Sequence, residues 1–330
     1  MTKNQTLIQD RFPDLNWSFD FPLAQESYFK VGGPAEIFIE LKDFKTLAEI
    51  LLFCQEQGIP WRIIGGASNL IIADQGVKGL VARFKANQFT VLSDTEQQLV
   101  FEAEAGIKTS ALVIKSAKYH ATGLEGFIGV PGTLGGAIYN NAHYLDYLIA
   151  DYIEFVTLFH VKQNKILTIS RENCQFAYEQ SIFQANKNLF ILKAQFKLAK
   201  ADPELIQSKL QEAQQRRLKT QPLNLPSSGC IFQNPKNTPA LKKRFPQFAQ
   251  QDFIPAGFLI DQAGLKGEQI GQIAVSDKHA AFMVNLASQE QAHLAKAKDI
   301  KKLIILVKDR VKEKFQLDLE EEIFYLGGEE

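Results

Sequence analysis

The chain has 330 residues, of which 45% are hydrophobic and 22% are charged, which is ordinary for a globular protein. Lysine plus arginine and aspartate plus glutamate both total 37, so no net field favours nucleic acid or an anionic membrane. The length allows two or three domains, each with its own core.

The first part of the chain predicts an α+β unit that ends near Phe84. Residues 37–41 have the pattern of a strand, and a helix that starts at Phe44 is expected to end at Gly58. Further strands are expected at residues 61–64, 70–73 and 79–83. The apolar residues at helical spacing are Phe44, Leu47, Leu51 and Cys54.

A second α+β unit is predicted to follow. Residues 99–104 alternate like a half-buried strand, and residues 109–121 have the pattern of a helix that stops at Gly123. We therefore divide residues 1–199 into subdomains of about 1–85 and 86–199. The later strands are expected at residues 153–159, 166–170 and 189–198.

A third region, residues 200–330, begins at a helix start. Asp202 is placed as the N-cap and Pro203 at the first helical position of a helix to about Lys219. An irregular loop is expected at residues 222–239. Ser288 and Gln291 fit a capping box before a long helix, and a last strand is expected at residues 317–326. The apolar stripe of that helix is Ile300, Leu303, Ile304, Val307, Val311 and Phe315.

The cysteines limit the compartment and the metal chemistry. Cys54, Cys174 and Cys230 are odd in number and far apart, so they form neither a disulfide framework nor a zinc-type spacing. Residues 1–14 lack the apolar stretch of a signal peptide, and no apolar run approaches the ~18 residues of a membrane span. We expect a cytoplasmic protein without a structural metal, nucleic acid or membrane partner.

Residues 123–136 (GLEGFIGVPGTLGG) hold six of the 21 glycines. Glycine N–H groups can approach a phosphate or a ring edge because no Cβ intervenes, so this loop predicts a large cofactor. A tight structural turn is the alternative. A second loop at residues 65–69 (GGASN) and the turn at residues 31–33 favour a ligand between two subdomains. Neither loop is a dinucleotide fingerprint or a P-loop.

Taken in order, several segments resemble UDP-N-acetylenolpyruvoylglucosamine reductases. The resemblance extends from about residue 27 to about residue 327. The segments are residues 28–35 (YFKVGGPA), 65–69 (GGASN), 129–136 (GVPGTLGG), 221–223 (QPL), 226–230 (PSSGC), 232–235 (FQNP), 259–267 (LIDQAGLKG) and 278–280 (KHA).

The resemblance implies an α+β fold, with an FAD-binding domain of the p-cresol methylhydroxylase type followed by a C-terminal α+β substrate-binding domain. The last strand would return toward the FAD-binding domain. It implies an enzyme that uses FAD and NADPH to reduce UDP-N-acetylglucosamine enolpyruvate to UDP-N-acetylmuramate in peptidoglycan synthesis, which serves cell-wall biogenesis, cell shape and cell division. We expect a monomer. The expected cofactor-binding positions are Gly32, Gly65, Gly66, Ala67, Ser68, Asn69, Glu125, Val130, Pro131, Gly132, Thr133, Gly135 and Gly136.

The reaction needs a proton donor, because hydride addition to the alkene leaves an enol-type anion beside a carboxylate. Cys230 matches the family's proton-donor position, which is serine or cysteine, and a thiol with a pKa of about 8.5 is suited to this role. A buried, inert cysteine is the alternative. Glu322 matches a glutamate that polarises the intermediate or relays a proton, with Glu320 and Glu321 as neighbours. The expected substrate-binding positions are Tyr178, Ser181, Asn234, Gln262 and Lys278.

The chain departs from the family pattern at two places. The family motif Tyr-Arg-x-Ser is Tyr178-Glu179-Gln180-Ser181 here, and that arginine pairs with the substrate carboxylate. Two unit charges ~4 Å apart interact by roughly 4 kcal/mol at an effective dielectric constant of about 20, so the reversed sign matters. His143 stands where glycine is usual and is expected to reshape the pocket.

Three explanations of Glu179 stay open. Another cation supplies the charge, or Glu179 points away from the pocket, or the protein no longer performs the reduction. We favour an active reductase with a relocated cation over an FAD or nucleotide-sugar binding protein without activity and over a flavin oxidoreductase with another substrate. The candidate cations are Arg171, Lys193, Arg216 and Lys278.

Residues 236–253 form an insertion relative to the family. Its aromatic residues are Phe245, Phe248 and Phe253. They either form a lid or pack against the C-terminal domain, and we expect packing.

Overall fold

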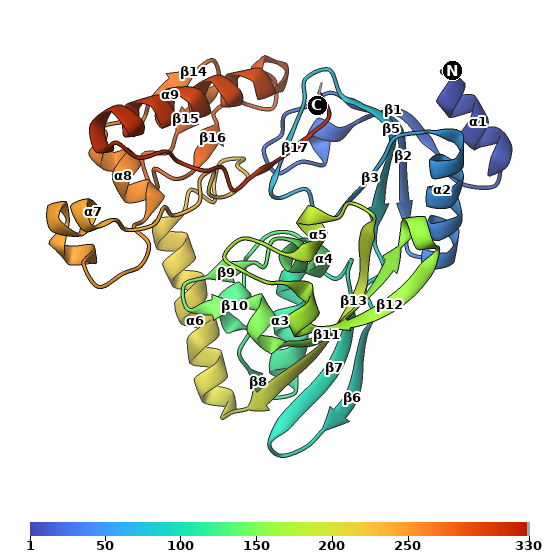
Figure 1. The fold of residues 1–330 in the computed structure, drawn as a ribbon, viewed down its shortest axis with the longest axis horizontal. Coiled ribbons are helices and arrows are strands. Elements are labelled where there is room, and N and C mark those ends of the chain that lie inside the picture. Colours follow the sequence, from blue (N-terminus) through green and yellow to red (C-terminus); the bar gives the residue numbers. More distant parts are fainter. Residues whose placement is uncertain (329–330) are drawn as a thin grey trace. The chain divides into compact units, whose positions relative to one another are not determined.

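The computed structural model describes residues 1–328 and divides into two compact units (Figure 1). Each unit collects segments from distant parts of the sequence. Unit 1 comprises Met1–Phe21, Ala35–Ala67 and Lys78–Arg217, and unit 2 comprises Pro22–Pro34, Ser68–Val77 and Leu218–Glu330.

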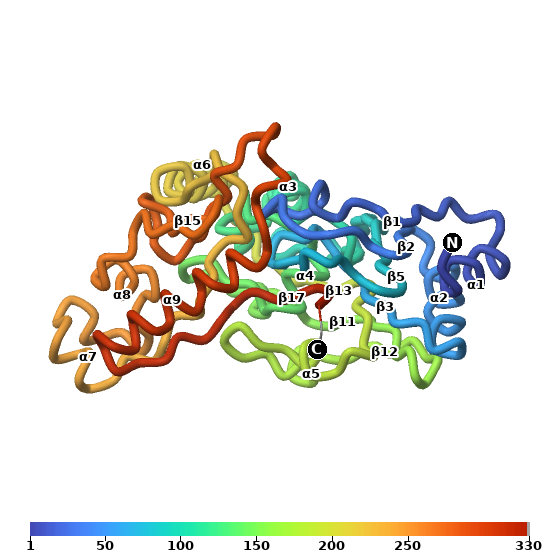
Figure 2. Tube along the Cα trace, turned by 90° about the horizontal axis from the view of Figure 1, so that it is seen from above, coloured from blue at the N-terminus to red at the C-terminus, as the bar shows by residue number. Residues whose placement is uncertain are grey.

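The first sheet has the strand order β1-β2-β5-β3, and β3 pairs in parallel with β5. Helix α2 (Phe44–Gln57) begins after Asp43, whose carboxylate accepts the Thr46 N–H at 2.7 Å, and it ends at the left-handed Gly58 as predicted. Figures 1 and 2 show it beside α1 (Lys3–Arg11). The strands are β1 (Ser18–Pro22), β2 (Pro34–Leu41), β3 (Trp61–Ile64) and β5 (Val77–Phe84).

The second sheet of unit 1 is antiparallel, with the order β12-β11-β13-β7-β6 and β8 paired to β13. Its core includes the stacked rings of Phe101 and Phe196, whose centroids lie 5.1 Å apart. The strands are β6 (Phe89–Asp94), β7 (Gln98–Glu104), β8 (Ala121–Thr122), β11 (Ile153–His160), β12 (Lys165–Ser170) and β13 (Leu189–Lys200).

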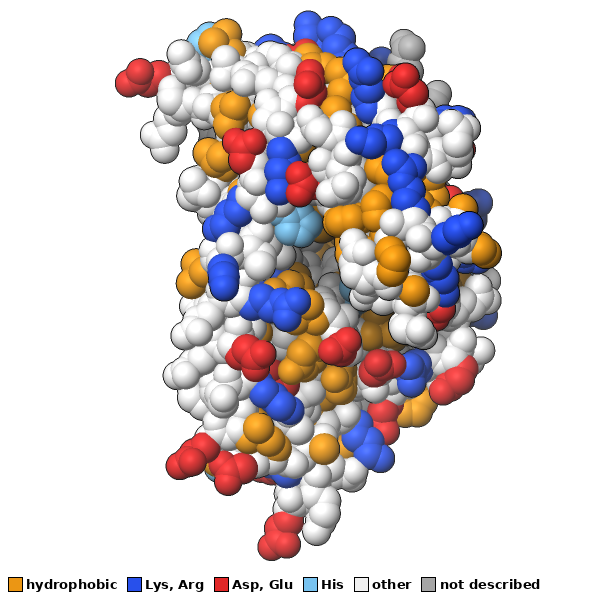
Figure 3. All heavy atoms as spheres, turned by 90° about the vertical axis from the view of Figure 1, so that its left-hand side faces the viewer, with side chains coloured by type: hydrophobic (Ala, Val, Ile, Leu, Met, Phe, Trp, Pro, Cys, Tyr) orange, Lys and Arg blue, Asp and Glu red, His pale blue; other side chains and the backbone are white. Residues whose placement is uncertain are grey.

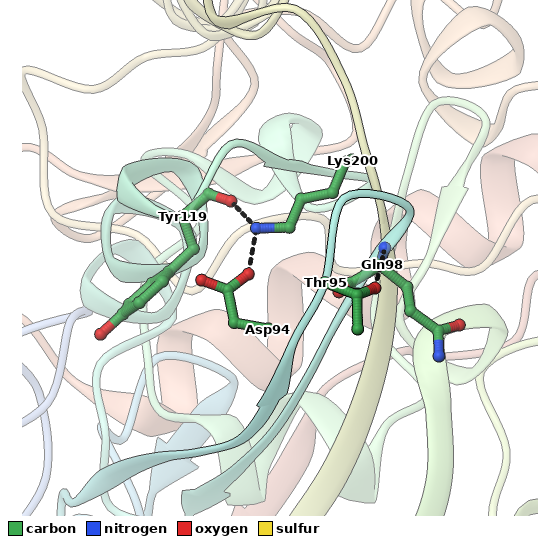
Figure 4. Close-up of polar contacts among 5 residues, drawn as sticks. All are labelled: Asp94, Thr95, Gln98, Tyr119 and Lys200. Carbon is green, nitrogen blue, oxygen red and sulfur yellow. Dashed lines mark hydrogen bonds and ion pairs between the residues drawn. The ribbon is translucent and has the colours of Figure 1, made fainter.

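Lys200 ends the last strand of this sheet. Its ammonium donates to the Asp94 carboxylate and to the Tyr119 carbonyl, while Thr95 and Gln98 close the neighbouring hairpin (Figure 4). Helix α6 (Pro203–Thr220) then begins at the predicted residue. The other helices and hairpin strands of unit 1 are α3 (Thr109–Lys118), α4 (Leu134–Tyr139), α5 (Ile182–Ala185), β9 (His143–Tyr144) and β10 (Tyr147–Leu148).

Unit 2 has its own core around α9 (Ala297–Phe315), which packs on the sheet β14-β15-β16 (Figure 1). The predicted apolar stripe of α9 is buried throughout. A parallel pair joins β4 (Leu70–Ile72) to β17 (Phe324–Leu326). The remaining elements are α7 (Pro239–Arg244), α8 (Ala256–Gln262), β14 (Gln269–Ile270), β15 (Ile273–Val275) and β16 (Met283–Asn285).

Several short 3-10 helices complete the chain. They are η1 (Leu23–Gln25), η2 (Glu125–Phe127), η3 (Ile149–Tyr152), η4 (Val161–Gln163), η5 (Arg171–Cys174), η6 (Pro246–Phe248) and η7 (Ala292–Leu294).

Three local predictions are wrong. The capping box at Ser288 does not start α9, because the Asp74 carboxylate accepts the N–H groups of Ala297 and Lys298 at 2.8 and 3.0 Å. The last strand covers only Phe324–Leu326, since its partner β4 is equally short. Helix α3 ends at Lys118, and Ala121 already belongs to β8.

The inserted segment packs as predicted. The Phe245 ring lies 5.0 Å from Phe258 and 5.9 Å from Phe315, and the Phe248 ring lies 4.8 Å from Phe258. These contacts join α7 and η6 to the core of unit 2.

Two observations concern the molecule as a whole. No helix within residues 1–328 combines the length and the apolar character that crossing a membrane requires. Basic and acidic side chains both occur across the face drawn in Figure 3, as the balanced composition predicts.

Candidate functional site

Two predicted cofactor loops meet inside unit 1. A side chain on Gly66 would come within 2.6 Å of the Gly132 Cα, and one on Gly65 would collide with the Thr133 hydroxyl. Gly66 and Gly132 therefore contact each other through the main chain alone. The N–H of Thr109, at the start of α3, donates to the Gly132 carbonyl at 3.2 Å. The sequence did not indicate that these particular glycines face each other.

The residues around these loops fit a bound FAD. The hydroxyl of Thr109 and the amide oxygens of Asn140 and Asn141 are buried, and no hydrogen-bond partner for them exists among the described residues. Buried polar atoms are normally paired, so a ligand with polar groups is one way to satisfy them. Bare glycine main chain beside such atoms suits the phosphates and ring edges of FAD.

The other loop positions mainly shape the backbone. Glu125 is buried, and its carboxylate accepts hydrogen bonds from Thr122 and from the Gly123 N–H at 2.5 and 2.6 Å. Gly135 donates its N–H to the Ala105 carbonyl at 2.8 Å, while Gly136 lies exposed in the first turn of α4. Val130 donates its N–H to Phe127, and Pro131 is half-buried beside it. Contacts with FAD stay predictions for all of them.

The Gly32 turn belongs to unit 2. Gly32 has φ +125° and lies against Ile72, and the Gly33 N–H donates to the Ala73 carbonyl at 2.8 Å. Ser68 and Asn69 also belong to unit 2, so the loop at residues 65–69 continues from one unit into the other.

Cys230 and Glu322 lie on neighbouring segments of unit 2. The Glu322 N–H donates to the carbonyl of Ile231, the residue after Cys230, at 2.8 Å. The Asn69 side-chain amide donates to the Glu322 carbonyl at 3.1 Å. A main-chain hydrogen bond therefore joins the segments of the two predicted catalytic residues, and the Asn69 side chain joins the end of one predicted cofactor loop to them.

Cys230 differs from the other cysteines. It is only half-buried, on a loop where Ile231 donates its N–H to Ala281 and Ser228 donates its hydroxyl to the Leu70 carbonyl. Cys54 and Cys174 are fully buried, and desolvation raises the pKa of each thiol to about 12. The alternative reading as a buried, inert cysteine therefore fits Cys54 and Cys174.

The neighbours of Glu322 have other contacts. The Glu321 carboxylate accepts from the Lys308 ammonium at 2.8 Å and from the Tyr325 hydroxyl at 2.5 Å. Burial and that hydrogen bond raise the pKa of Tyr325. Glu320 is exposed.

Three further predicted positions also lie in unit 2. The Asn234 side-chain oxygen accepts the N–H of Ala256 at 2.9 Å, where α8 begins. Gln262 is exposed at the end of α8, and the Lys278 ammonium donates to the Leu218 carbonyl at 2.6 Å. Their substrate roles stay predictions.

The two departures from the family pattern contact each other in unit 1. Glu179 is buried, and its carboxylate forms an ion pair with Nδ1 of His143. The Tyr178 ring lies 5.1 Å from the imidazole, and the Ser181 hydroxyl donates to the Tyr139 carbonyl at 2.7 Å. Nothing in the sequence indicated that positions 143 and 179 form a pair.

Two of the candidate cations, Arg171 and Lys193, form ion pairs with other acidic side chains. The guanidinium of Arg171 contacts Asp151 at 2.7 Å, and the Lys193 ammonium contacts Glu102 at 2.6 Å. Arg216 is exposed on α6. The next residue, Arg217, was missed; it is buried, with its guanidinium 4.9 Å from the centroid of the Tyr144 ring. Adjacent arginines on one helix must point to different sides, and that was the available signal.

Across residues 1–328, His, Cys, Asp and Glu side chains form no group of three that could hold a metal ion.

Two family models match the chain. Residues 35–170 match the FAD binding domain, and residues 221–326 match the UDP-N-acetylenolpyruvoylglucosamine reductase C-terminal domain. These matches agree with the fit of the glycine loops to FAD.

Relatives align over nearly the whole chain. The UDP-N-acetylenolpyruvoylglucosamine reductase of Lachnoclostridium phytofermentans is 34% identical over 307 residues, which cover 93% of this chain and 91% of the relative. That of Caldicellulosiruptor saccharolyticus is 36% identical over 310 residues, with the same coverage. The crystal structure of the Thermus caldophilus reductase has a TM-score of 0.71 at 28% identity and covers 95% of this chain and 99% of its own.

These findings confirm the predicted fold class, an α+β FAD-binding domain of the p-cresol methylhydroxylase type followed by an α+β C-terminal domain. They also confirm FAD as the cofactor and NADPH as the reductant. The chain belongs to the UDP-N-acetylenolpyruvoylglucosamine reductase family and is an FAD-dependent oxidoreductase.

Proposed function

We propose that this chain reduces the enolpyruvyl group of UDP-N-acetylglucosamine enolpyruvate to give UDP-N-acetylmuramate, with NADPH as the reductant. The observation that carries the proposal is the main-chain hydrogen bond from Glu322 to Ile231, which places a carboxylate residue beside the half-buried Cys230. FAD, when bound, supplies the transfer of hydride from NADPH to the alkene. We retain residues 1–199 as its binding domain and residues 200–330 as the substrate domain.

Cys230 is the proposed proton donor. Its Sγ holds the proton that the carbon next to the substrate carboxylate takes up. A half-buried thiol on an ordered loop is reachable by a ligand, whereas Cys54 and Cys174 are not.

Glu322 is proposed to stabilise or relay that proton. Its main chain is bonded on one side to Ile231 and on the other to Asn69, so its backbone position is fixed independently of its carboxylate. A side chain on a fixed backbone loses less entropy when it takes up a single catalytic orientation.

The remaining parts of the proposal concern the substrate. We propose that Tyr178, Ser181, Asn234, Gln262 and Lys278 contact the UDP-sugar and that the enzyme acts as a cytoplasmic monomer. The proposed partner is this small molecule, with no role for nucleic acid or a membrane.

The test follows the visible absorbance of the purified yellow protein. NADPH should bleach the flavin, and the enolpyruvyl substrate should restore its colour with one product formed per NADPH consumed. Full FAD occupancy without turnover would reject the reductase and support a binding protein. Rapid recovery of colour in oxygen alone would support an oxidoreductase with a different substrate.

A further inference from the structure

We infer that His143 binds the substrate carboxylate and that Glu179 is the residue that positions it, an assignment that rests on the function proposed above. His143 replaces a small residue and Glu179 replaces a cation in the motif pattern of this chain. In the structure the two side chains form one ion pair between Nδ1 and Oε1. The two departures are therefore one coupled exchange.

Burial, pairing and a backbone contact hold Glu179 in place. Only 5% of its side chain is exposed, and a buried carboxylate is stable only when it is paired. Its backbone has φ +54°, and Gln184 donates its side-chain amide to the Glu179 carbonyl at 2.9 Å. The ion pair with His143 thus explains how this position tolerates a carboxylate.

His143 is the accessible member of the pair, with 27% of its side chain exposed. Because Nδ1 contacts Glu179, Nε2 lies on the opposite side of the ring and is directed away from the carboxylate. Within residues 1–328, Nε2 has no hydrogen-bond partner. A protonated imidazole donates through both nitrogens, so this ring can hold Glu179 and still offer an N–H to an anion.

A second cation, Arg217 of α6, contacts the same hairpin. His143 and Tyr144 form β9, and the buried Arg217 guanidinium stacks on the Tyr144 ring. Arg217 also approaches Gly129 in the glycine-rich loop, where its Nε would lie 3.4 Å from an added Cβ. Arg217 therefore contacts both the hairpin that carries His143 and the glycine-rich loop. That arrangement suits a substrate whose reacting group carries a carboxylate.

The first experiment compares two ligands on the FAD-loaded protein by calorimetry. UDP-N-acetylmuramate carries a carboxylate on its lactyl ether, and UDP-N-acetylglucosamine lacks it. His143→Gln should weaken binding of the first ligand by about 10- to 100-fold, the range for a lost charged hydrogen bond, and change the second by less than about twofold. Glu179→Gln should also weaken binding of UDP-N-acetylmuramate more than binding of UDP-N-acetylglucosamine.

Turnover gives an independent measure. His143→Gln should raise KM for the enolpyruvyl substrate, while the rate at which NADPH bleaches the flavin stays unchanged. Arg171→Gln removes the cation of another ion pair in unit 1, Arg171 with Asp151, and should leave both ligand affinities as they are. Equal losses for the two ligands, or no loss, in folded His143→Gln would overturn the assignment.

A double variant keeps the assignment testable if His143→Gln or Glu179→Gln fails to fold. His143→Gly combined with Glu179→Arg restores the pattern of the family motif and should recover selective binding of the carboxylate ligand. A folded double variant that does not recover this selectivity would count against the assignment. Wild-type protein that binds UDP-N-acetylmuramate selectively but consumes no NADPH would reject the proposed function and leave the role of His143 in place.

Discussion

The surroundings of Cys230 in unit 2 and of Glu179 in unit 1 are held in different ways. Cys230 and Glu322 lie on segments joined chiefly by main-chain hydrogen bonds, from Glu322 to Ile231 and from Ile231 to Ala281, with one further bond from the Asn69 side-chain amide. The segment of Glu179 is joined to its neighbours chiefly by side chains: His143, Gln184 and Ser181 supply the contacts.

This difference explains why the sequence departs from the family motif around Glu179. A site built from main-chain bonds keeps its geometry when one side chain changes, because the backbone groups are common to all residues. A site built from side chains loses a buried partner with each single change, so viable changes come in pairs. The loop of Cys230, the proposed proton donor, fits the first case, and the His143–Glu179 exchange fits the second.

The largest expected effect comes from Cys230→Ala. Loss of a positioned proton donor should slow substrate reduction by about 10²- to 10⁴-fold, while NADPH still reduces the flavin at the wild-type rate. Because the loop is held by its main chain, the free energy of unfolding should change by less than ~1 kcal/mol. Stopped-flow absorbance separates the two half-reactions. Equal loss of both would exclude a role as proton donor.

A thiol-labelling experiment tests, without mutation, whether Cys230 is more accessible and reactive than the other two cysteines. At about pH 8 a thiol with a pKa of about 12 is ionised in roughly one part in 10⁴, so Cys54 and Cys174 should resist iodoacetamide in the folded protein. Cys230 should be the thiol that reacts, and UDP-N-acetylmuramate should protect it. Mass spectrometry of the labelled peptides is the measurement. Labelling of all three cysteines at similar rates would contradict this contrast.

Unlike Cys230→Ala, Glu179→Ala should lower the stability of the fold. It removes the partner of His143 from a buried position, so the free energy of unfolding should fall by about 1–3 kcal/mol along with affinity for the carboxylate ligand. Urea denaturation measures the stability. Ser116→Ala, which removes a buried hydroxyl of unit 1 that donates to the Val113 carbonyl at 2.9 Å, is the matched control and should cost about 1 kcal/mol without changing ligand selectivity. A Glu179→Ala protein as stable as wild type would show that side chains do not hold this segment.

The smallest expected effect gives a baseline remote from both regions. Asp43 caps α2, and its hydrogen bonds to Thr46 lower the pKa of the carboxyl below its ordinary 3.8. A lowered folded pKa contributes stability above the ordinary value, and this contribution is lost as the pH falls through the folded pKa. Asp43→Ala should therefore cost about 1 kcal/mol near neutrality and less in acid. Asp43→Asn keeps a capping side chain and should remove the part of the pH dependence of stability that comes from this carboxyl. Thermal unfolding measured at several pH values tests this, and an Asp43→Asn protein with the same pH dependence as wild type would contradict it.

Several structural features could be predicted because they depend on neighbours in sequence. The α2 helix with its end at Gly58, the start of α6 at Pro203 and the buried stripe of α9 follow from local periodicity and capping. The start of α9 was mispredicted because its cap, Asp74, lies 223 residues away. Local patterns carry no information about such a partner.

The candidate site residues also divide into those that the sequence indicates and those that only the tertiary structure reveals. By itself the sequence determined the family and the two glycine loops and proposed Cys230 and Glu322 as candidates, because these depend on ordered motifs and on residue chemistry. Tertiary structure alone decided that Gly66 meets Gly132, that Arg217 stacks on Tyr144 and that His143 pairs with Glu179. The physical reason is that charges and close contacts act through space, so a residue that looks out of place along the chain can be satisfied by a distant one.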